Sequence, residues 1–306
     1  KMSLDSAVSH TLAEMSLENI KKSLSMMYRK AAKSHNAIHQ FMLVAPKLFP
    51  SPPLPREGKD WHRNSAFLTY HWEAFHSAHR SFHEAVSGGY NAAFILLRAT
   101  LELLIRGAFF ECLAHRKFRD TSKRLDREIH ADKLKHFIED VIKLRPSIEQ
   151  DLETISVAIY DKLEPVIDEP EFRVPVKTMV MQLEKWGILR GVENPSQTIW
   201  NLYQILSKDV HVLPDRTDIG KALLYAPKDL FKTPKLMRKQ LAEYLHALKE
   251  VMDIGIVVEL NILRDNLVKY KQAKDYVRGL LRDREFRYLE LKHTPKLIQM
   301  VTAMHD

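Results

Sequence analysis

The sequence predicts an all-α protein. Apolar side chains recur at steps of three and four residues along most of the chain, which is the spacing of one face of a helix. Glycine is rare, with 9 residues against 14 prolines in a chain of 306, and this favours helices joined by proline-marked breaks over tight β-turns. No stretch shows the alternation of apolar and polar side chains that is typical of a β-strand.

The N-terminal part predicts one helix over residues 1–45, with the regular pattern beginning near residue 4. Five prolines then fall within the ten residues from Pro46 to Pro55. A helix cannot continue through so many prolines, since each lacks an amide donor and clashes with the preceding turn. Residues 46–59 are therefore expected to form an extended linker.

The middle of the chain, residues 60–225, predicts a helical bundle. Its first two helices are expected at 60–87 and 90–115, on either side of the strong stop formed by Gly88-Gly89. Shorter helices are expected between the following prolines and glycines, at 131–144, 147–168, 176–189 and 195–211.

The last part, residues 226–306, predicts a long helix and a short one. The long helix is expected to begin at Thr233-Pro234, because threonine caps helices and proline suits the first helical position. Apolar residues at steps of four and three, from Leu241 to Leu267, predict a buried seam. Thr294-Pro295 repeats the starting signal and predicts a final short helix.

Cysteine usage and hydropathy predict a soluble, cytoplasmic protein. Cys112 is the one cysteine, so no internal disulfide forms, and a reducing compartment is the simplest interpretation. The most apolar run, 90–110, is interrupted by Arg98, Glu102 and Arg106, and three charges near the middle of a candidate span exclude a bilayer helix. We expect no membrane partner and no cofactor.

The charge is basic and unevenly distributed. The whole chain carries +8. Residues 1–150 hold 23 basic and 16 acidic side chains, and residues 216–306 hold 18 and 12, whereas residues 151–215 hold 6 and 11. Two basic regions therefore flank an acidic middle. Basic surfaces attract polyanions such as RNA, DNA or anionic lipid.

The C-terminal basic region interleaves lysines and arginines with aromatic residues such as Tyr276 and Tyr288. Cations that meet phosphates and rings that stack on bases are typical of a single-stranded nucleic-acid surface. A solvated amphipathic helix has the same composition, so both interpretations stay open. The candidate nucleic-acid-binding residues are Lys269, Lys271, Lys274, Arg278, Arg282, Arg284 and Arg287.

Charges inside the apolar run 90–110 predict a polar network. Arg98, Glu102 and Arg106 stand at i, i+4 and i+8 and share one helix face. An apolar helix rarely carries three charges without partners, so a buried polar network at a cleft is one expectation. A salt bridge at the helix surface is the other.

The end of the predicted helix 195–211 holds the candidate catalytic residues. Ser207 and His211 are i, i+4 neighbours that could touch, and Arg216 follows in a polar loop. Nucleophilic catalysis also needs an orienting group and an oxyanion site, which the sequence does not identify. The alternative places His211 favourably against the helix dipole, with no catalytic role.

Histidines gather in the predicted helix 60–87. His76, His79 and His83 fall within about 60° of one another on the helix, and this spacing can present imidazoles to a metal. That face carries no cysteine or carboxylate, so we expect no metal there. Two Glu-x-x-His steps, at 73–76 and 243–246, would suit a di-iron bundle, although chance alone supplies about one.

Two segments resemble a known family. Residues 88–102, Gly-Gly-Tyr-Asn-Ala-Ala-Phe followed by Arg98 and Glu102, resemble a signature helix of HEPN-type helical-bundle proteins. Residues 203–211 are similar to the second signature helix of its uncharacterised, abortive-infection-related branch. The resemblance spans roughly residues 60–220. It implies a HEPN-like bundle and association with RNA.

The same resemblance bears on catalysis. Many HEPN proteins are metal-independent RNases, with an arginine followed after four to six residues by a histidine. Here no arginine precedes His211 at that distance, and Arg216 follows it instead. The resemblance therefore implies RNA association more than RNA cleavage.

These observations rank three functions. The preferred one is a non-catalytic factor that binds RNA or a ribonucleoprotein such as the ribosome. The second is a metal-independent RNase of a defence or toxin system. The third is a helical protein-interaction scaffold with no nucleic-acid role. The sequence is compatible with a homodimer in each case.

Overall fold

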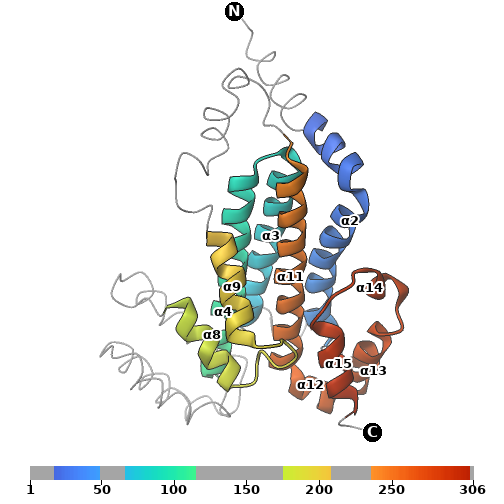
Figure 1. The fold of residues 1–306 in the computed structure, drawn as a ribbon. Coiled ribbons are helices and arrows are strands. Elements are labelled where there is room, and N and C mark those ends of the chain that lie inside the picture. Colours follow the sequence, from blue (N-terminus) through green and yellow to red (C-terminus); the bar gives the residue numbers. More distant parts are fainter. Residues whose placement is uncertain (1–16, 49–65, 115–174, 208–235, 304–306) are drawn as a thin grey trace, which may run out of the picture.

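The computed structural model describes residues 17–48, 66–114, 175–207 and 236–303 (Figure 1). Every regular element within these ranges is a helix, so the all-α prediction is confirmed for them. The helices expected at 131–144 and 147–168 lie outside the described residues, as does most of the proline-rich linker.

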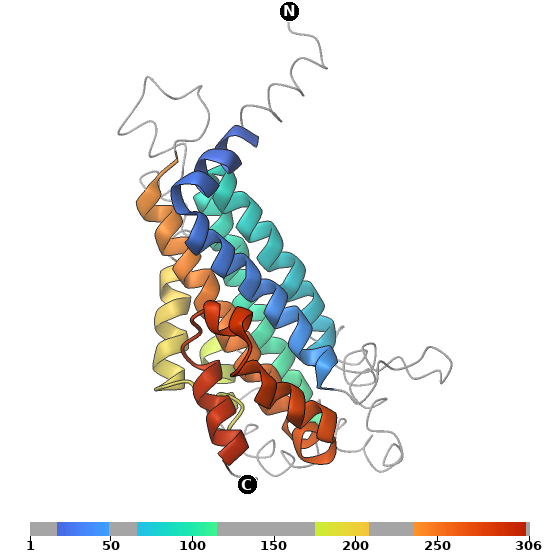
Figure 2. The ribbon, with the colours of Figure 1, turned by 90° about the vertical axis from the view of Figure 1, so that its right-hand side faces the viewer.

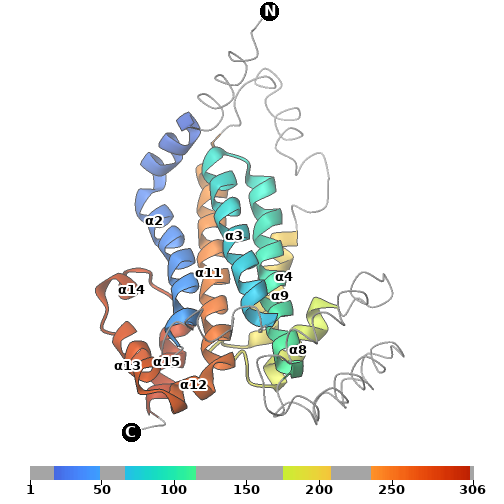
Figure 3. The ribbon, with the colours of Figure 1, turned by 180° about the vertical axis from the view of Figure 1, so that it is seen from behind.

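Four long helices form the core of the described structure: α2 (Glu18–Lys47), α3 (Ala66–Ser87), α4 (Tyr90–Ala114) and α11 (Arg238–Ile262). They lie side by side along much of their length (Figures 1 and 3). Every residue of α11 from Val251 to Ile262 is buried, since α2, α3 and α4 surround it. The core therefore draws on helices from the N-terminal, middle and C-terminal parts of the chain.

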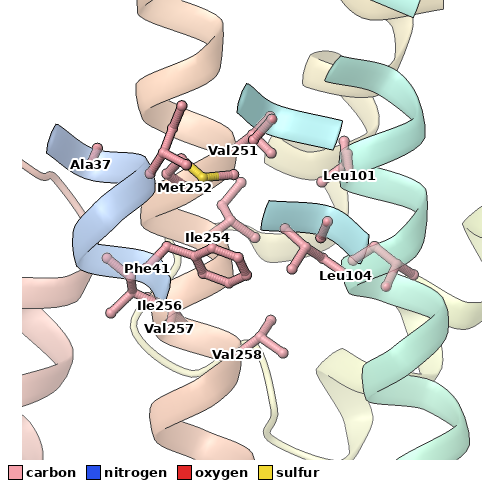
Figure 4. Packing of buried hydrophobic residues seen from close by; sticks show 14 of the residues in the cluster. Ala37, Phe41, Leu101, Leu104, Val251, Met252, Ile254, Ile256, Val257 and Val258 are labelled. Carbon is pink, nitrogen blue, oxygen red and sulfur yellow. The ribbon is translucent and has the colours of Figure 1, made fainter. Parts of the chain in front are cut away.

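The centre of this core is tightly packed around Gly255 of α11. Figure 4 shows Phe41 of α2 and Leu104 of α4 directed toward the neighbouring helices. A Cβ atom at Gly255 would lie 2.9 Å from two ring carbons of Phe41 and 3.2 Å from Leu104 Cδ1. Glycine is therefore what lets Phe41 lie flat against α11.

The predicted stop between α3 and α4 is confirmed in detail. Gly88 has a φ of 97°, which favours glycine, and its amide donates to the Ala85 carbonyl at 3.2 Å. The amide of Gly89 donates to the Glu84 carbonyl at 2.8 Å. This is the Schellman pattern of helix ends, and it turns the chain at once into α4.

Two helix boundaries differ from the prediction. The first helix continues through Pro46 to Lys47, because a proline in the last turn removes only one amide donor from the helix. The same helix is kinked at Met27 (φ −139°, ψ 32°). The start expected at Pro234 is wrong. Helix α11 begins at Arg238 after an extended Met237, whose amide donates to the Tyr90 hydroxyl of α4 at 3.1 Å.

The seam predicted from Leu241 to Leu267 is divided between α11 and α12 (Arg264–Lys269). Three short helices follow and pack near the ends of α2 and α11 (Figure 2). They are α13 (Lys271–Leu280), α14 (Arg284–Tyr288) and α15 (Thr294–Ala303), and the last confirms the start predicted at Thr294.

Asp253 fixes this C-terminal part to α11. Its buried carboxylate accepts hydrogen bonds from the amides of Lys292 (2.6 Å), His293 (2.7 Å) and Thr294 (2.9 Å). It also accepts the Thr294 hydroxyl at 2.6 Å. A carboxylate at a helix N-terminus satisfies free amides and opposes the helix dipole, so Asp253 caps α15 from another helix.

Helices α8 (Val176–Lys185) and α9 (Pro195–Ser207) pack against α4 (Figure 1). The helix expected at 176–189 ends early because Gly187 takes a φ of 76° and closes its last turn. The side-chain amide of Asn261 donates to the carbonyls of Ile188 (3.0 Å) and Arg190 (2.9 Å), and so holds the turn after α8 against α11.

No helix among the described residues is both long and apolar enough to cross a membrane.

Candidate functional site

Arg98 and Glu102 form a hydrogen-bonded network with Tyr203 of α9. Arg98 donates to Glu102 Oε1 at 2.9 Å and to the Tyr203 hydroxyl at 2.6 Å. The Tyr203 hydroxyl donates to the same Glu102 oxygen at 3.0 Å, and the guanidinium carbon lies 4.7 Å from the Tyr203 ring centre. The two helices that carry the resemblance, α4 and α9, are thus joined by a closed polar triangle.

This network differs from the expectation in two ways. The side chains of Arg98 and Glu102 remain 24% and 25% exposed, so the network is partly open to solvent rather than buried. Within the described ranges, no hydrogen bond or ion pair includes Arg106, whose predicted place is taken by Tyr203. The reason is geometric: positions i and i+8 of a helix lie about 80° apart, and α9 covers only one side of α4.

The electrostatics of the triangle keep Tyr203 in its neutral form. Burial and the neighbouring Glu102 carboxylate raise the pKa of Tyr203, so its hydroxyl stays protonated and can donate. Ser207, one turn later, donates its hydroxyl to the Tyr203 carbonyl at 2.6 Å, a common helix back-bond. His211 and Arg216 lie outside the described residues, so the catalytic Ser207–His211 pair stays a prediction.

A groove of about 820 Å³ lies between α14 and α2. Arg284, Arg287 and Tyr288 line it from α14. Asn36, His39 and Gln40 line it from α2. Two of the seven predicted nucleic-acid-binding residues therefore meet a face of α2 that carries amides and an imidazole.

The other predicted cations are not among the described residues that line this groove. Lys271 and Arg282 are exposed, whereas Lys274 and Arg278 are partly buried on α13. The side chain of Lys269 is not among those described.

Local contacts hold the groove-lining side of α14. Asp283 caps this one-turn helix, and its Oδ1 accepts the amides of Glu285 (2.7 Å) and Phe286 (3.0 Å). Lys33 of α2 lies 4.9 Å from the Tyr288 ring centre and pairs with Glu290 at 2.5 Å. Tyr288 itself remains 43% exposed, so part of its side chain is accessible to a ligand.

A second pocket, of about 680 Å³, lies between α8 and α9. Trp200 and Tyr203 stack in it with ring centres 5.6 Å apart, and Lys177 Nζ lies 5.6 Å from the Trp200 ring centre. Four apolar and five polar or charged side chains line the remainder, and Met181 is 45% exposed. The pocket therefore offers both apolar and hydrogen-bonding groups to a partner.

The three histidines of α3 that the sequence grouped as metal candidates do not come together in the structure. His76 and His83 are exposed on α3. His79 instead faces His35 and His39 of α2, and the nearest ligand nitrogens of these three lie within 4.8 Å of one another. The signal that could have found them is the step of four between His35 and His39.

The di-iron alternative is wrong. Such bundles project every carboxylate and imidazole inward. All four members of the two Glu-x-x-His steps, Glu73, His76, Glu243 and His246, are exposed.

A buried acid–base pair was missed by the sequence reasoning. His71 Nδ1 of α3 lies 2.7 Å from Glu259 Oε1 of α11, and both side chains are fully buried. Burial lowers the pKa of His71 to about 3 and raises that of Glu259 well above its ordinary value. The available signal was a lone glutamate inside the most apolar stretch of the seam.

Comparison with protein families, with curated proteins and with solved structures finds no match for this chain. Only the geometry of the described residues therefore bears on its function.

Proposed function

We propose that this protein binds single-stranded RNA, free or within a ribonucleoprotein such as the ribosome, and that it does so without cleaving it. The observation that carries the proposal is the groove between α2 and α14, in which Arg284 and Arg287 lie beside the exposed ring of Tyr288. Cations and an accessible aromatic ring in one groove are the two components of single-strand recognition.

Each groove-lining group has a matching part of a nucleotide. The guanidinium groups of Arg284 and Arg287 can pair with phosphate oxygens through two parallel hydrogen bonds. Tyr288 offers a ring for base stacking, which is worth about 1–3 kcal/mol per base. The amides of Asn36 and Gln40 can donate to and accept from base edges.

Charge and size limit what the groove holds. Glu285 also lines it, and its negative charge offsets the positive charge of one of the two arginines. Affinity for RNA must therefore draw on cations outside the groove. A volume of about 820 Å³ is in the range of small-molecule sites and accommodates roughly one or two nucleotide units. Exposed cations of the same C-terminal part, Arg282 and Lys271, are candidates to contact the remaining strand.

A second candidate function, a protein-interaction scaffold, is favoured by the pocket between α8 and α9. Met181 lines this pocket and is 45% exposed, and Ile205 of α9 is 46% exposed. Such exposed apolar side chains suit an apolar segment of a partner protein.

The test is a salt series of RNA binding. Filter binding of an unstructured RNA to the wild type and to the double variant Arg284→Glu with Arg287→Glu gives the slope of log affinity against log salt. Each phosphate contact contributes about −0.7 to this slope for single strands, so losing two contacts flattens it by about 1.4. Binding of all RNA sequences should weaken alike, and the RNA should be recovered intact.

A charge-matched control separates the groove from net charge. Arg238 and Lys239 are exposed at the start of α11, and reversing both to Glu changes the net charge by the same amount. The control should retain most of the wild-type slope. Equal slopes for the wild type and the groove variant, or equal losses in the groove and control variants, would contradict the proposal.

A further inference from the structure

Three imidazole rings meet where α2 crosses α3. The ring centres of His35 and His39 lie 4.7 Å apart, and His79 lies 5.2 Å and 5.1 Å from them. The rings thus form a nearly equilateral triangle. Phe75 packs 4.6 Å from His79 and Phe82 packs 5.1 Å from His35, so aromatic rings shield two sides of it.

One nitrogen of this cluster lacks a hydrogen-bond partner in the described part of the chain. Nε2 of His79 is buried and has no hydrogen-bond partner among the described residues. A buried ring nitrogen without a partner is costly, and each such group in a native structure needs an explanation. A bound cation at the centre of the triangle supplies one.

Protonation does not stabilise three imidazoles in contact. Burial lowers the pKa of His79, and the neighbouring His35 and His39 lower it further. Burial, followed by the charge of His39, lowers the pKa of His35. Neutral imidazole is the form that binds metals.

We propose that His35, His39 and His79 form a binding site for a divalent transition metal ion, with zinc as its best-suited occupant. His35 and His39 are one helical turn apart, which is the spacing that lets two imidazoles on one helix share an ion. His79 supplies the third nitrogen from the facing helix.

The distances are compatible with such a site. The nearest ligand nitrogens lie within 4.8 Å of one another. Tetrahedral zinc, with bonds of about 2.0–2.1 Å, places its nitrogen ligands about 3.4 Å apart. Rotation of partly exposed imidazoles about their side-chain bonds can close a gap of this size without moving either helix. Three protein nitrogens leave one position for water or an anion, as in His₃ zinc sites.

The site touches the groove but does not depend on its proposed ligand. His39 lines the groove together with Arg284 and Tyr288. An ion on His39 would add a positive charge at the groove wall. Metal binding itself rests only on the three histidines and is measured in the absence of RNA.

The experiment is a metal titration of the full chain after treatment with a chelator. Cobalt(II) serves as the spectroscopic probe, followed by displacement with zinc(II), and elemental analysis gives the stoichiometry. We expect about one ion per chain, and an affinity at least about tenfold weaker in His39→Ala and in His79→Ala. The variants His76→Ala and His83→Ala are matched controls, since both remove an exposed histidine from α3, and they should bind as the wild type does.

The outcomes are decisive. Absence of binding at micromolar cobalt or zinc, or equal affinity in the wild type and both triad variants, overturns the site. Circular dichroism checks the fold. If His79→Ala fails to fold, His39→Ala decides the question, because His39 lines the groove and its removal should disturb the fold less. The groove variant Arg284→Glu with Arg287→Glu should keep its metal, so loss of RNA binding and loss of metal binding are distinguishable.

Discussion

Nδ1 of His71 and Oε1 of Glu259 lie 2.7 Å apart in the middle of the helical core, where neither side chain has any exposed surface. Burial lowers the pKa of His71 to about 3 and raises the pKa of Glu259 well above 4.5. Both shifts favour the neutral form of each group. The pair therefore favours one proton and no net charge, which avoids the cost of burying two ions.

The two pKa shifts predict opposite effects of pH on stability: the shift of His71 makes stability rise with pH, and the shift of Glu259 makes it fall. The lowered pKa of His71 adds stability as pH rises from about 3 to 6.5, the range in which the unfolded histidine loses its proton. The raised pKa of Glu259 removes stability as pH rises from 4.5 toward the folded value. The two slopes oppose each other between 4.5 and 6.5. Above 6.5 only the loss from Glu259 remains, at most about 1.4 kcal/mol per pH unit, and it ends when pH passes the folded pKa of Glu259.

Urea unfolding between pH 4 and 8.5 of the wild type and of Glu259→Gln measures this dependence. Glutamine does not titrate, so the difference in unfolding free energy between the two proteins should fall as pH rises from 4.5 toward the folded pKa of Glu259, by at most about 1.4 kcal/mol per pH unit. All other titrating groups cancel in the difference. A difference that stays constant with pH would show that Glu259 is already ionised in the folded protein.

The Arg98 triangle predicts a moderate loss of stability. Arg98→Ala removes two hydrogen bonds to charged or polar groups and leaves Glu102 beside Tyr203 without its cation. Because the side chains are about a quarter exposed, we expect a loss of about 1–2 kcal/mol rather than that of a fully buried pair.

Arg106→Ala, on the same helix but outside the triangle, should cost less than about 0.5 kcal/mol. Thermal unfolding compares the two variants. Equal melting temperatures would mean that the triangle contributes nothing to the packing of α9 on α4.

Replacing glycine by alanine should change the stability of the fold in opposite directions at two sites. A Cβ atom at Gly107 would lie 2.6 Å from Tyr70 Cβ, an atom fixed to the backbone of α3. Gly107→Ala should therefore destabilise the fold by about 1–3 kcal/mol through overpacking. At Gly279 a Cβ atom would meet nothing within 4 Å, so Gly279→Ala should stabilise by up to about 1 kcal/mol through helix propensity. Chemical denaturation of both variants checks the signs, and a gain at Gly107 would show that α3 and α4 can separate at little cost.

Local signals account for what the sequence predicted well. The stop at Gly88-Gly89 depends on residues within one helical turn, so it is readable without knowledge of the fold. The start at Thr294 was readable from Thr294-Pro295, although its cap, Asp253, comes from another helix. The start of α11 was misplaced because the extended Met237 amide pairs with Tyr90, which is 147 residues away.

The candidate sites depend on pairings of this second kind. The histidines of α3 were grouped by their own helix wheel, yet the partners of His79 come from α2, and His39 lies 40 positions before His79 in the sequence. Tyr203 replaced Arg106 beside Glu102 for the same reason. Helix periodicity gives the face on which a residue lies, and the fold decides which other face meets it.

Asp253 predicts a link between the core and the groove. Its carboxylate accepts three amides and a hydroxyl from residues 292–294, directly after the segment that carries Arg284 and Arg287. Asp253→Ala leaves these buried donors without partners, so we expect a loss of about 3–5 kcal/mol and faster hydrogen exchange throughout α15. Asp253→Asn keeps one oxygen acceptor and should lose less.

Both variants raise the net charge by one, which alone would strengthen binding to a polyanion. Weaker RNA binding by Asp253→Asn, measured by filter binding at a temperature where the variant is folded, would therefore show that Asp253 positions the groove. Glu243→Ala, an exposed site on the same helix with the same change of charge, should bind RNA at least as tightly as the wild type. Equal affinities in Asp253→Asn and Glu243→Ala would show that the groove does not depend on this anchor.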